Sequence, residues 1–241
     1  MHLVGQLLFL LGGFVMEQNS LEAFLFPLEK ENWRDICNSI VYLRCPQKLE
    51  VLRKAGFDVD SRNDGVLALC FVDHNEGLSF YVIAAAHIRA DNIFVSKENP
   101  ASVVLLHASS MPDALCLKSD YINADVTRYE SYVTQIVRQY EYGIDDAIKM
   151  RGIPELDDFR KPFFPDDVEV LLLGKGLEQE RAFVRCCKYG QSCLYGKLLD
   201  EPTQDFGIHK GQQIDFMVLE REGGLSTVHL KNKRSGPATP S

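Results

Sequence analysis

The sequence predicts an α+β fold: an N-terminal α+β domain with an antiparallel sheet and a long amphipathic helix, followed by a small C-terminal all-β partly open barrel. Two observations carry this prediction. Before residue 155, two stretches place apolar residues three and four apart, which is the period of a helix. After residue 165, only short apolar runs remain, separated by turn-forming residues, which is typical of strands.

The first helical stretch covers residues 29–41. Its apolar positions fall on one helical face: Trp33, Ile36, Cys37, Ile40 and Val41. Pro46 then opens a shorter predicted helix over residues 47–55, and Gly56 supplies its C-terminal cap.

Strands follow. Residues 66–72 and 78–86 are apolar runs separated by the polar segment 73–77, which is the signature of a hairpin. Residues 102–107 and 114–118 form a second pair of runs. We expect about four strands, and we expect them to be antiparallel because the connections are too short for crossovers.

The strongest predicted helix extends from Asp125, which can cap it, to Gly152 and Pro154, which end it. Its apolar face is long and carries three tyrosines: Tyr129, Tyr132, Val133, Ile136, Val137, Tyr140, Ile144, Ala147 and Ile148. We interpret this stripe as core packed against the sheet, with a binding platform as the alternative.

Residues 155–165 are polar, contain prolines and lack periodicity, so we predict a linker there. It separates an α+β domain over residues 17–154 from a barrel-like domain over residues 166–230. Five short runs provide the barrel strands: 168–173, 182–187, 193–199, 213–219 and 225–230. The tail, residues 231–241, is rich in Lys, Arg, Gly, Pro and Ser, and we expect it to be disordered.

The first sixteen residues are expected to be an apolar leader or a misassigned start. Residues 3–16 are nearly all apolar, yet fall short of the roughly 20 residues of a spanning helix. They also lack the basic region and cleavage site of a signal peptide. The seven cysteines are odd in number and mostly lie in apolar runs, which favours reduced thiols and a cytoplasmic location.

Charge limits the choice of partner. The formal net charge is −8 and the pI is near 5.3, which disfavours non-specific nucleic-acid binding because that requires clustered Lys and Arg. An acidic surface attracts basic partners, although many acidic proteins owe only their solubility to such charge.

No cofactor or metal is predicted. Gly174-Lys175-Gly176 follows a strand but lacks the remaining residues of a dinucleotide loop or a P-loop. Neither Cys-x-x-Cys nor His-Glu-x-x-His occurs. The run from Asp58 to Gly65 hints at a calcium loop, but Phe71 stands where the bidentate Glu belongs, so we interpret it as a polar turn.

Catalytic residues are not predicted either. A cysteine triad of Cys193, His209 and Asp205 can be drawn, as can a pairing of Ser109 with His107. Neither set lies in a local signature of a nucleophile, and chance pairings are expected among so many cysteines and histidines.

One segment has a specific pattern. Gly196-Lys197-Leu198 leads into Asp200-Glu201-Pro202, and a loop through Lys210-Gly211 then enters an alternating strand. In that loop Phe206 and Ile208 are expected to plug the barrel end. Over residues 181–230 this order resembles a small bacterial β-domain family of unknown function, with Gln212 where that family usually has Asp. The resemblance implies a β-domain fold, and some members occur in toxin-immunity proteins.

The sequence therefore yields two hypotheses. The first is a non-catalytic binding protein, a bacterial immunity or antitoxin-like protein that masks a basic protein partner such as a toxin. Its predicted binding residues are acidic: Glu155, Asp157, Asp158, Asp166, Asp167 and Glu169. A solvated linker is the plainer interpretation of that stretch. The second hypothesis is an enzyme of unrecognised type with a site at the domain junction, using His209 or Cys193.

Overall fold

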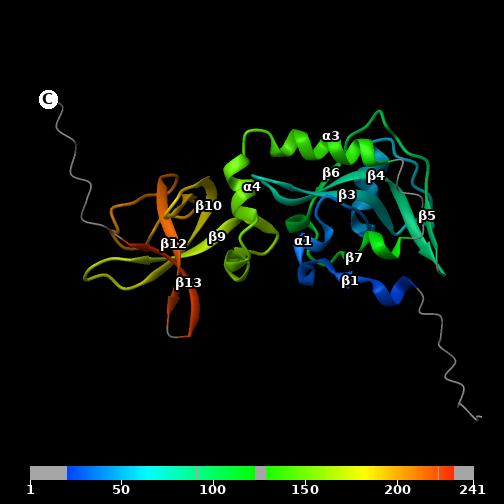
Figure 1. The fold of residues 1–241 in the computed structure, drawn as a ribbon. Coiled ribbons are helices and arrows are strands. Elements are labelled where there is room, and N and C mark those ends of the chain that lie inside the picture. Colours follow the sequence, from blue (N-terminus) through cyan, green and yellow to red (C-terminus); the bar gives the residue numbers. More distant parts are fainter. Residues whose placement is uncertain (1–20, 91, 123–128, 222, 231–241) are drawn as a thin grey trace, which may run out of the picture.

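The computed structural model describes residues 21–90, 92–122, 129–221 and 223–230. The predicted leader, the predicted tail and the proposed helix cap Asp125 lie outside the described residues. Figure 1 shows an antiparallel sheet with helix α3 above it, and a barrel beside the sheet, with helix α4 between the two.

The larger sheet is built from the first half of the chain, and its paired strands all run antiparallel, as predicted. In spatial order its strands are β1 (Phe26–Pro27), β7 (Leu115–Leu117), β2 (Ile40–Arg44), β3 (Gly65–Asp73), β4 (Gly77–Arg89) and β5 (Asn92–Val95). Strand β6 (Leu105–His107) pairs with β4.

Both faces of this sheet are buried. Alternate residues of β3 point to opposite sides, so Val66, Ala68 and Cys70 join one core. Leu67, Leu69 and Phe71 join the other. Strands covered on both faces are continuously apolar, which is why β3 shows a run rather than an alternation.

The predicted helix over residues 29–41 is wrong in extent. The structure has only a 3₁₀ turn η2 (Leu28–Lys30) and one short helix α1 (Trp33–Ile36), and the chain then enters β2. Asn32 begins α1 by accepting a hydrogen bond from the backbone N–H of Arg34 at 3.1 Å. Asn38 adopts a positive φ of 59° and ends the helical path, so Ile40 and Val41 lie in a strand.

The second predicted helix agrees with the structure. A 3₁₀ turn η3 (Pro46–Lys48) leads into α2 (Leu49–Lys54), with Pro46 at its first position. Gly56 follows with φ of +84°, as a left-handed C-terminal residue should.

A single long helix is not observed. The chain forms α3 (Glu130–Glu141) and α4 (Asp145–Arg151), separated by Gly143, whose φ of +78° no helix permits. Helix α3 lies against the sheet, where the ring centroids of Tyr140 and Phe71 are 4.3 Å apart. Helix α4 packs instead on the barrel through Met150. The break at Gly143 therefore leads the chain from the sheet, with its covering helices, to the barrel; we call these the two units.

The segment predicted as a linker is packed. It forms a 3₁₀ helix η7 (Pro154–Phe159) and strand β8 (Arg160–Lys161). Leu156 is fully buried in the barrel core, although its neighbours are polar. Residues 155–165 therefore form a wall of the barrel unit.

The barrel comprises β9 (Phe164–Leu173), β10 (Glu180–Tyr189), β11 (Leu194–Leu198), β12 (Gln213–Arg221) and β13 (Gly224–Leu230). Successive strands pair antiparallel, and β13 returns to pair parallel with β9, for example Val228 with Leu171. The sheet is closed, so the prediction of a partly open barrel is wrong in this respect. The predicted plug is confirmed: Phe206 is buried in the barrel core and Ile208 packs against it.

Across the residues that the structure describes, no helix has both the length and the apolar character needed to cross a membrane.

Candidate functional site

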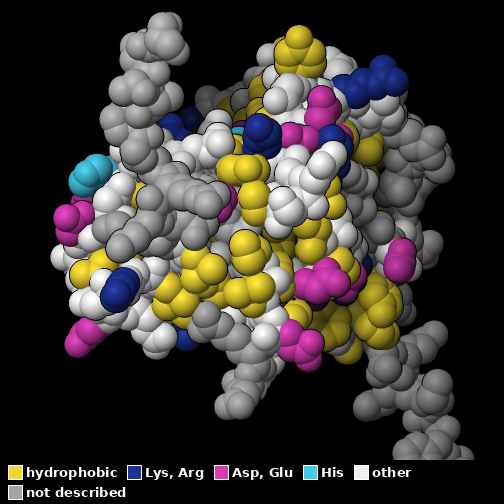
Figure 2. Space-filling model, turned by 60° about the vertical axis from the view of Figure 1, so that its left-hand side comes forward, with side chains coloured by type: hydrophobic (Ala, Val, Ile, Leu, Met, Phe, Trp, Pro, Cys, Tyr) yellow, Lys and Arg dark blue, Asp and Glu magenta, His cyan; other side chains and the backbone are white. Residues whose placement is uncertain are grey.

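A groove opens on the barrel beside η7, between the β10–β11 turn and the β12–β13 hairpin. Its volume is about 490 Å³. The lining is mostly apolar and comes from four segments: Ile153, Glu155, Tyr189, Gly190, Gln191, Ser192, Cys193, Leu194, Met217, Val218, Glu220 and Leu225. Figure 2, which views the molecule from the barrel side, shows hydrophobic side chains gathered in a broad area with Asp and Glu beside them. We call these lining residues the barrel groove.

One wall of the barrel groove is a strand edge. Strand β11 pairs with β12 only as far as Leu194 opposite Phe216. Strand β12 continues to Arg221 with β13 on its other side. Among the described strands, none pairs with the edge of β12 from Met217 onward. Backbone N–H and C=O groups of alternate residues therefore face the groove without a strand partner, which makes this edge able to accept an added strand.

Among the described residues that line the barrel groove, two carry a carboxylate and none carries a positive charge. Glu155 and Glu220 are both exposed, and neither forms an ion pair with a described residue. Neither Lys nor Arg is among the lining residues. The groove thus combines an apolar floor with negative potential at its edge.

The predicted acidic residues are scattered rather than gathered. Glu155 lies in the barrel groove and Asp158 is exposed nearby in η7. Asp157 is bound by Arg34 and Arg160, with Nε–oxygen distances of 2.8 Å for each. Glu169 pairs with Arg181 at 2.7 Å.

Asp166 and Asp167 do not belong to an acidic surface, which corrects the sequence interpretation. They are 2% and 1% exposed, and each carboxylate is held by an arginine. A buried, paired carboxylate cannot attract a partner from solution. Of the six predicted residues, only Glu155 and Asp158 are exposed carboxylates without an ion pair to a described residue.

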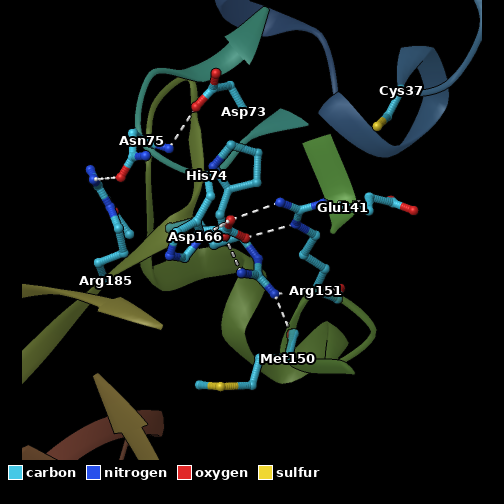
Figure 3. A network of polar contacts seen from close by, with 12 residues as sticks. Cys37, Asp73, His74, Asn75, Glu141, Met150, Arg151, Asp166 and Arg185 are labelled. Atoms are coloured by element: carbon cyan, nitrogen blue, oxygen red, sulfur yellow. Dashed lines mark hydrogen bonds and ion pairs between the residues drawn. The ribbon is translucent and has the colours of Figure 1, made fainter. Parts of the chain in front are cut away.

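The buried network around Asp166 joins the two units (Figure 3). Arg151 of α4 donates from Nε and Nη2 to the two carboxylate oxygens of Asp166, both at 2.8 Å. His74, in the β3–β4 turn, places Nδ1 2.7 Å from the same carboxylate. Burial alone would raise the pKa of Asp166, but the hydrogen bonds from Arg151 and His74 outweigh it and hold that pKa at about 2.

A second pair reinforces this junction. Arg185 of β10 binds Asp167 with Nε and Nη2 at 2.8 and 3.1 Å. Its Nη1 donates to Asn75 of the β3–β4 turn at 3.2 Å. The same turn is therefore held by the barrel through both His74 and Asn75.

A third cluster fixes η7. Arg34 of α1 binds both oxygens of Asp157 at 2.8 Å and also reaches the carbonyl of Arg151. Arg160 donates to Asp157 and to the carbonyl oxygen of Met150, at 2.8 and 2.9 Å. The guanidinium of Arg34 lies 4.6 Å from the ring centroid of Trp33. Since η7 carries Glu155, this cluster positions one wall of the barrel groove.

The proposed catalytic sets are not assembled. His209 binds Glu201 at 2.7 Å. Asp205 accepts from the backbone of Gly207 at 2.9 Å. Cys193 lies instead in the barrel groove.

The pairing of Ser109 with His107 is absent as well. His107 bonds through Nδ1 to Ser79 at 2.9 Å, and its carbonyl accepts from Ser110. Within the described residues, then, neither proposed nucleophile has its proposed base in contact.

The buried thiols are poorly suited to act as nucleophiles. All seven cysteines are free. Burial raises the pKa of Cys45, Cys116 and Cys186 to about 12 and that of Cys37 to about 11. Nor do three His, Cys, Asp or Glu side chains gather around a possible metal position in the described part of the chain.

Sequence reasoning missed the arginines that neutralise these carboxylates and the apolar residues of the barrel groove. Arg151 and Arg185 lie 15 and 18 residues from their aspartates, and Arg34 lies 123 residues from Asp157. Nothing in a local pattern marks such pairs. The groove does leave a weak signal in the sequence: Tyr189 lies within the turn-forming stretch 188–191 and Leu225 directly follows the stretch 220–224, where apolar side chains are not needed for a core.

Comparison of the chain with models of protein families, with curated proteins and with solved structures gave no match.

Proposed function

We propose that this protein is a non-catalytic binding protein that engages a basic protein partner through the barrel groove, in the manner of a bacterial immunity or antitoxin-like protein. The observation that carries the proposal is the combination of an apolar floor with the exposed carboxylates of Glu155 and Glu220, which form no ion pair with a described residue. Apolar contacts supply affinity at the centre of such interfaces, and rim charges select the partner.

The free edge of β12 suggests how the partner is held. An extended segment that lies along Met217 to Glu220 would pair with the exposed backbone groups of that edge. Its alternate side chains would face the apolar floor formed by Ile153 and Leu225. Basic side chains on the other positions would lie near Glu155 and Glu220.

Rigidity favours this mode of binding. The wall that bears Glu155 is fixed by Asp157, which two arginines hold. A preformed groove loses little conformational entropy when it is occupied. Of the acidic residues predicted between 155 and 169, mainly Glu155 and Asp158 offer negative charge to a partner, because Asp166 and Asp167 are buried.

Selection of random peptides displayed on phage against the full chain tests the proposal. We expect the enriched peptides to alternate apolar residues with Lys or Arg. The variant Glu155→Lys with Glu220→Lys should no longer select basic peptides, because the rim charge is reversed. The control variant Glu178→Gln with Asp58→Asn changes two exposed carboxylates outside the groove and should select the same peptides as the native protein.

Association kinetics then connect the groove to a natural partner. The product of the neighbouring gene is the probe, measured across a salt series. Charge reversal at Glu155 and Glu220 should lower the on-rate by about tenfold or more at low salt, with a smaller change in the off-rate. Enrichment of acidic or uncharged peptides, or an unchanged on-rate for the reversed variant, contradicts the proposal.

A further inference from the structure

A second pocket lies at the junction of the two units, away from the barrel groove. Its volume is about 480 Å³. The β3–β4 turn and three segments of the barrel line it: His74, Asn75, Arg185, Cys187, Lys197, Leu198, Leu199, Lys210 and Gly211. We call these residues the junction pocket. Its size falls within the range of small-molecule sites.

The junction pocket is basic in a protein of net charge −8. Lys197 and Lys210 are exposed, and neither ammonium group forms an ion pair with a described residue. Glu201, which accepts from the backbone N–H of Lys210 at 2.8 Å, gives its other oxygen to His209. Asp or Glu side chains are absent from the lining. Two positive charges therefore face one concave space whose described lining contains no carboxylate, while Glu201 and Asp167 lie outside that lining.

Two further cationic or polar donors are fixed at the pocket wall. Arg185 uses three of its five N–H groups on Asp167 and Asn75, which leaves two that can serve a ligand. His74 is bonded to Asp166 through Nδ1, so Nε2 is the ring nitrogen that could contact a ligand. The buried aspartates orient these side chains and lie behind them.

The backbone brings the two lysines to the same space. The N–H of Gly211 donates to the carbonyl of Leu198 at 2.8 Å, which ties the loop before β12 to the end of β11. Gly211 has φ of +85°, and a Cβ there would lie 3.7 Å from Cε of Lys197. The side chain of Lys197 thus passes over the turn that bears Lys210.

We infer that the junction pocket binds a phosphate-bearing organic anion. The phosphate would lie between Lys197, Lys210 and the remaining N–H groups of Arg185, since guanidinium and ammonium groups are preferred phosphate donors. The organic part would contact Leu198 and Leu199.

Isothermal titration calorimetry of the full chain tests this inference, with adenosine monophosphate, inorganic phosphate and succinate as probes. We expect saturable binding of adenosine monophosphate, weaker binding of inorganic phosphate, and a loss of affinity as ionic strength rises. The variant Lys197→Gln with Lys210→Gln should bind adenosine monophosphate at least about tenfold more weakly. The matched control Lys54→Gln with Lys175→Gln removes two exposed lysines elsewhere and should bind as the native chain does.

A folding defect should not obscure the result, because both lysines are exposed and form no ion pair with a described residue. Near-ultraviolet circular dichroism of the variant should match that of the native protein. Amide resonances of Gly211 and Lys197 should shift on titration of the native chain. Absence of saturable binding, equal binding by the double variant, or succinate binding as tight as that of adenosine monophosphate would overturn the inference. The double lysine variant should still select the same basic peptides through the barrel groove, so failure of this inference leaves the proposed function unchanged.

Discussion

Arg151 donates two parallel hydrogen bonds to Asp166, from Nε and from Nη2, each 2.8 Å long. Both residues are buried, with exposures of 7% and 2%. The pair connects α4 to the start of strand β9, and the same carboxylate is bonded to His74 from the sheet. The junction thus depends on a charge that solvent does not reach.

Removal of one partner of this pair should be costly. Asp166→Ala removes the carboxylate that binds Arg151 most closely and leaves its guanidinium only Glu141, 3.7 Å away. Loss of one partner of a buried ion pair typically costs about 3–5 kcal/mol of unfolding free energy. Urea denaturation measures the change. Asp158→Asn, an exposed residue of η7 without an ion pair to a described residue, is the matched control and should lie within about 0.5 kcal/mol of the native protein.

Acid should weaken the junction. The pKa of Asp166 is about 2 in the folded chain, below its ordinary value of 3.8. Its contribution is therefore complete above about pH 4 and is lost as the pH falls toward 2; it amounts to on the order of 2 kcal/mol. Titration of the Asp166 carboxyl carbon by nuclear magnetic resonance should give a midpoint near pH 2. A midpoint near 4 would show that Arg151 and His74 do not hold the carboxylate ionised.

Much of the fold can be predicted because its signals are local. The hairpin turn at residues 73–77, the glycine cap at Gly56 and the runs that form the barrel strands each depend on neighbours in sequence. Phe206 was predictable as a plug because it is the large apolar side chain of an otherwise polar loop.

The remainder depends on distant pairings. Barrel closure joins Val228 to Leu171, and no local pattern reports a parallel contact between strands so far apart. Residues 29–41 fit a helical period, yet tertiary pairing of Ile40 with Leu69 places that position in a strand. Asp166 and Asp167 resembled solvated acids because their arginines are remote in sequence.

Thiol reactivity should separate the cysteines into two groups. Cys187 is exposed and Cys193 half-buried, whereas Cys45, Cys70, Cys116 and Cys186 are fully buried. Cys37 is half-buried, but burial raises the pKa of its thiol to about 11, so we place it with the unreactive group. Ellman's reagent should therefore modify Cys187 and Cys193 in the native protein and all seven thiols in denaturant. Cys187→Ser should remove one reactive thiol at native conditions. Fewer than seven thiols in the denatured chain would reveal a disulfide and contradict the free state of these residues.

Gly77 should be the most sensitive glycine of the junction. It begins β4 with φ of +77°, and a Cβ there would lie 2.2 Å from the carbonyl oxygen of Phe163. That oxygen accepts a hydrogen bond from the N–H of Leu78 at 2.7 Å. A shift of Phe163 away from an added Cβ would break this bond between the two units.

Gly77→Ala therefore combines a left-handed backbone with a backbone clash. Gly176 offers the matched control, since its φ of +79° is nearly the same and no atom lies within 4 Å of a Cβ placed there. Gly176→Ala should lose only about 1 kcal/mol, the cost of the backbone conformation. Gly77→Ala should lose about 2 kcal/mol more, because the clash displaces backbone rather than a flexible side chain. Urea denaturation of both variants measures the difference. Equal losses would mean that the β3–β4 turn and Phe163 are not held together as tightly as their hydrogen bond implies.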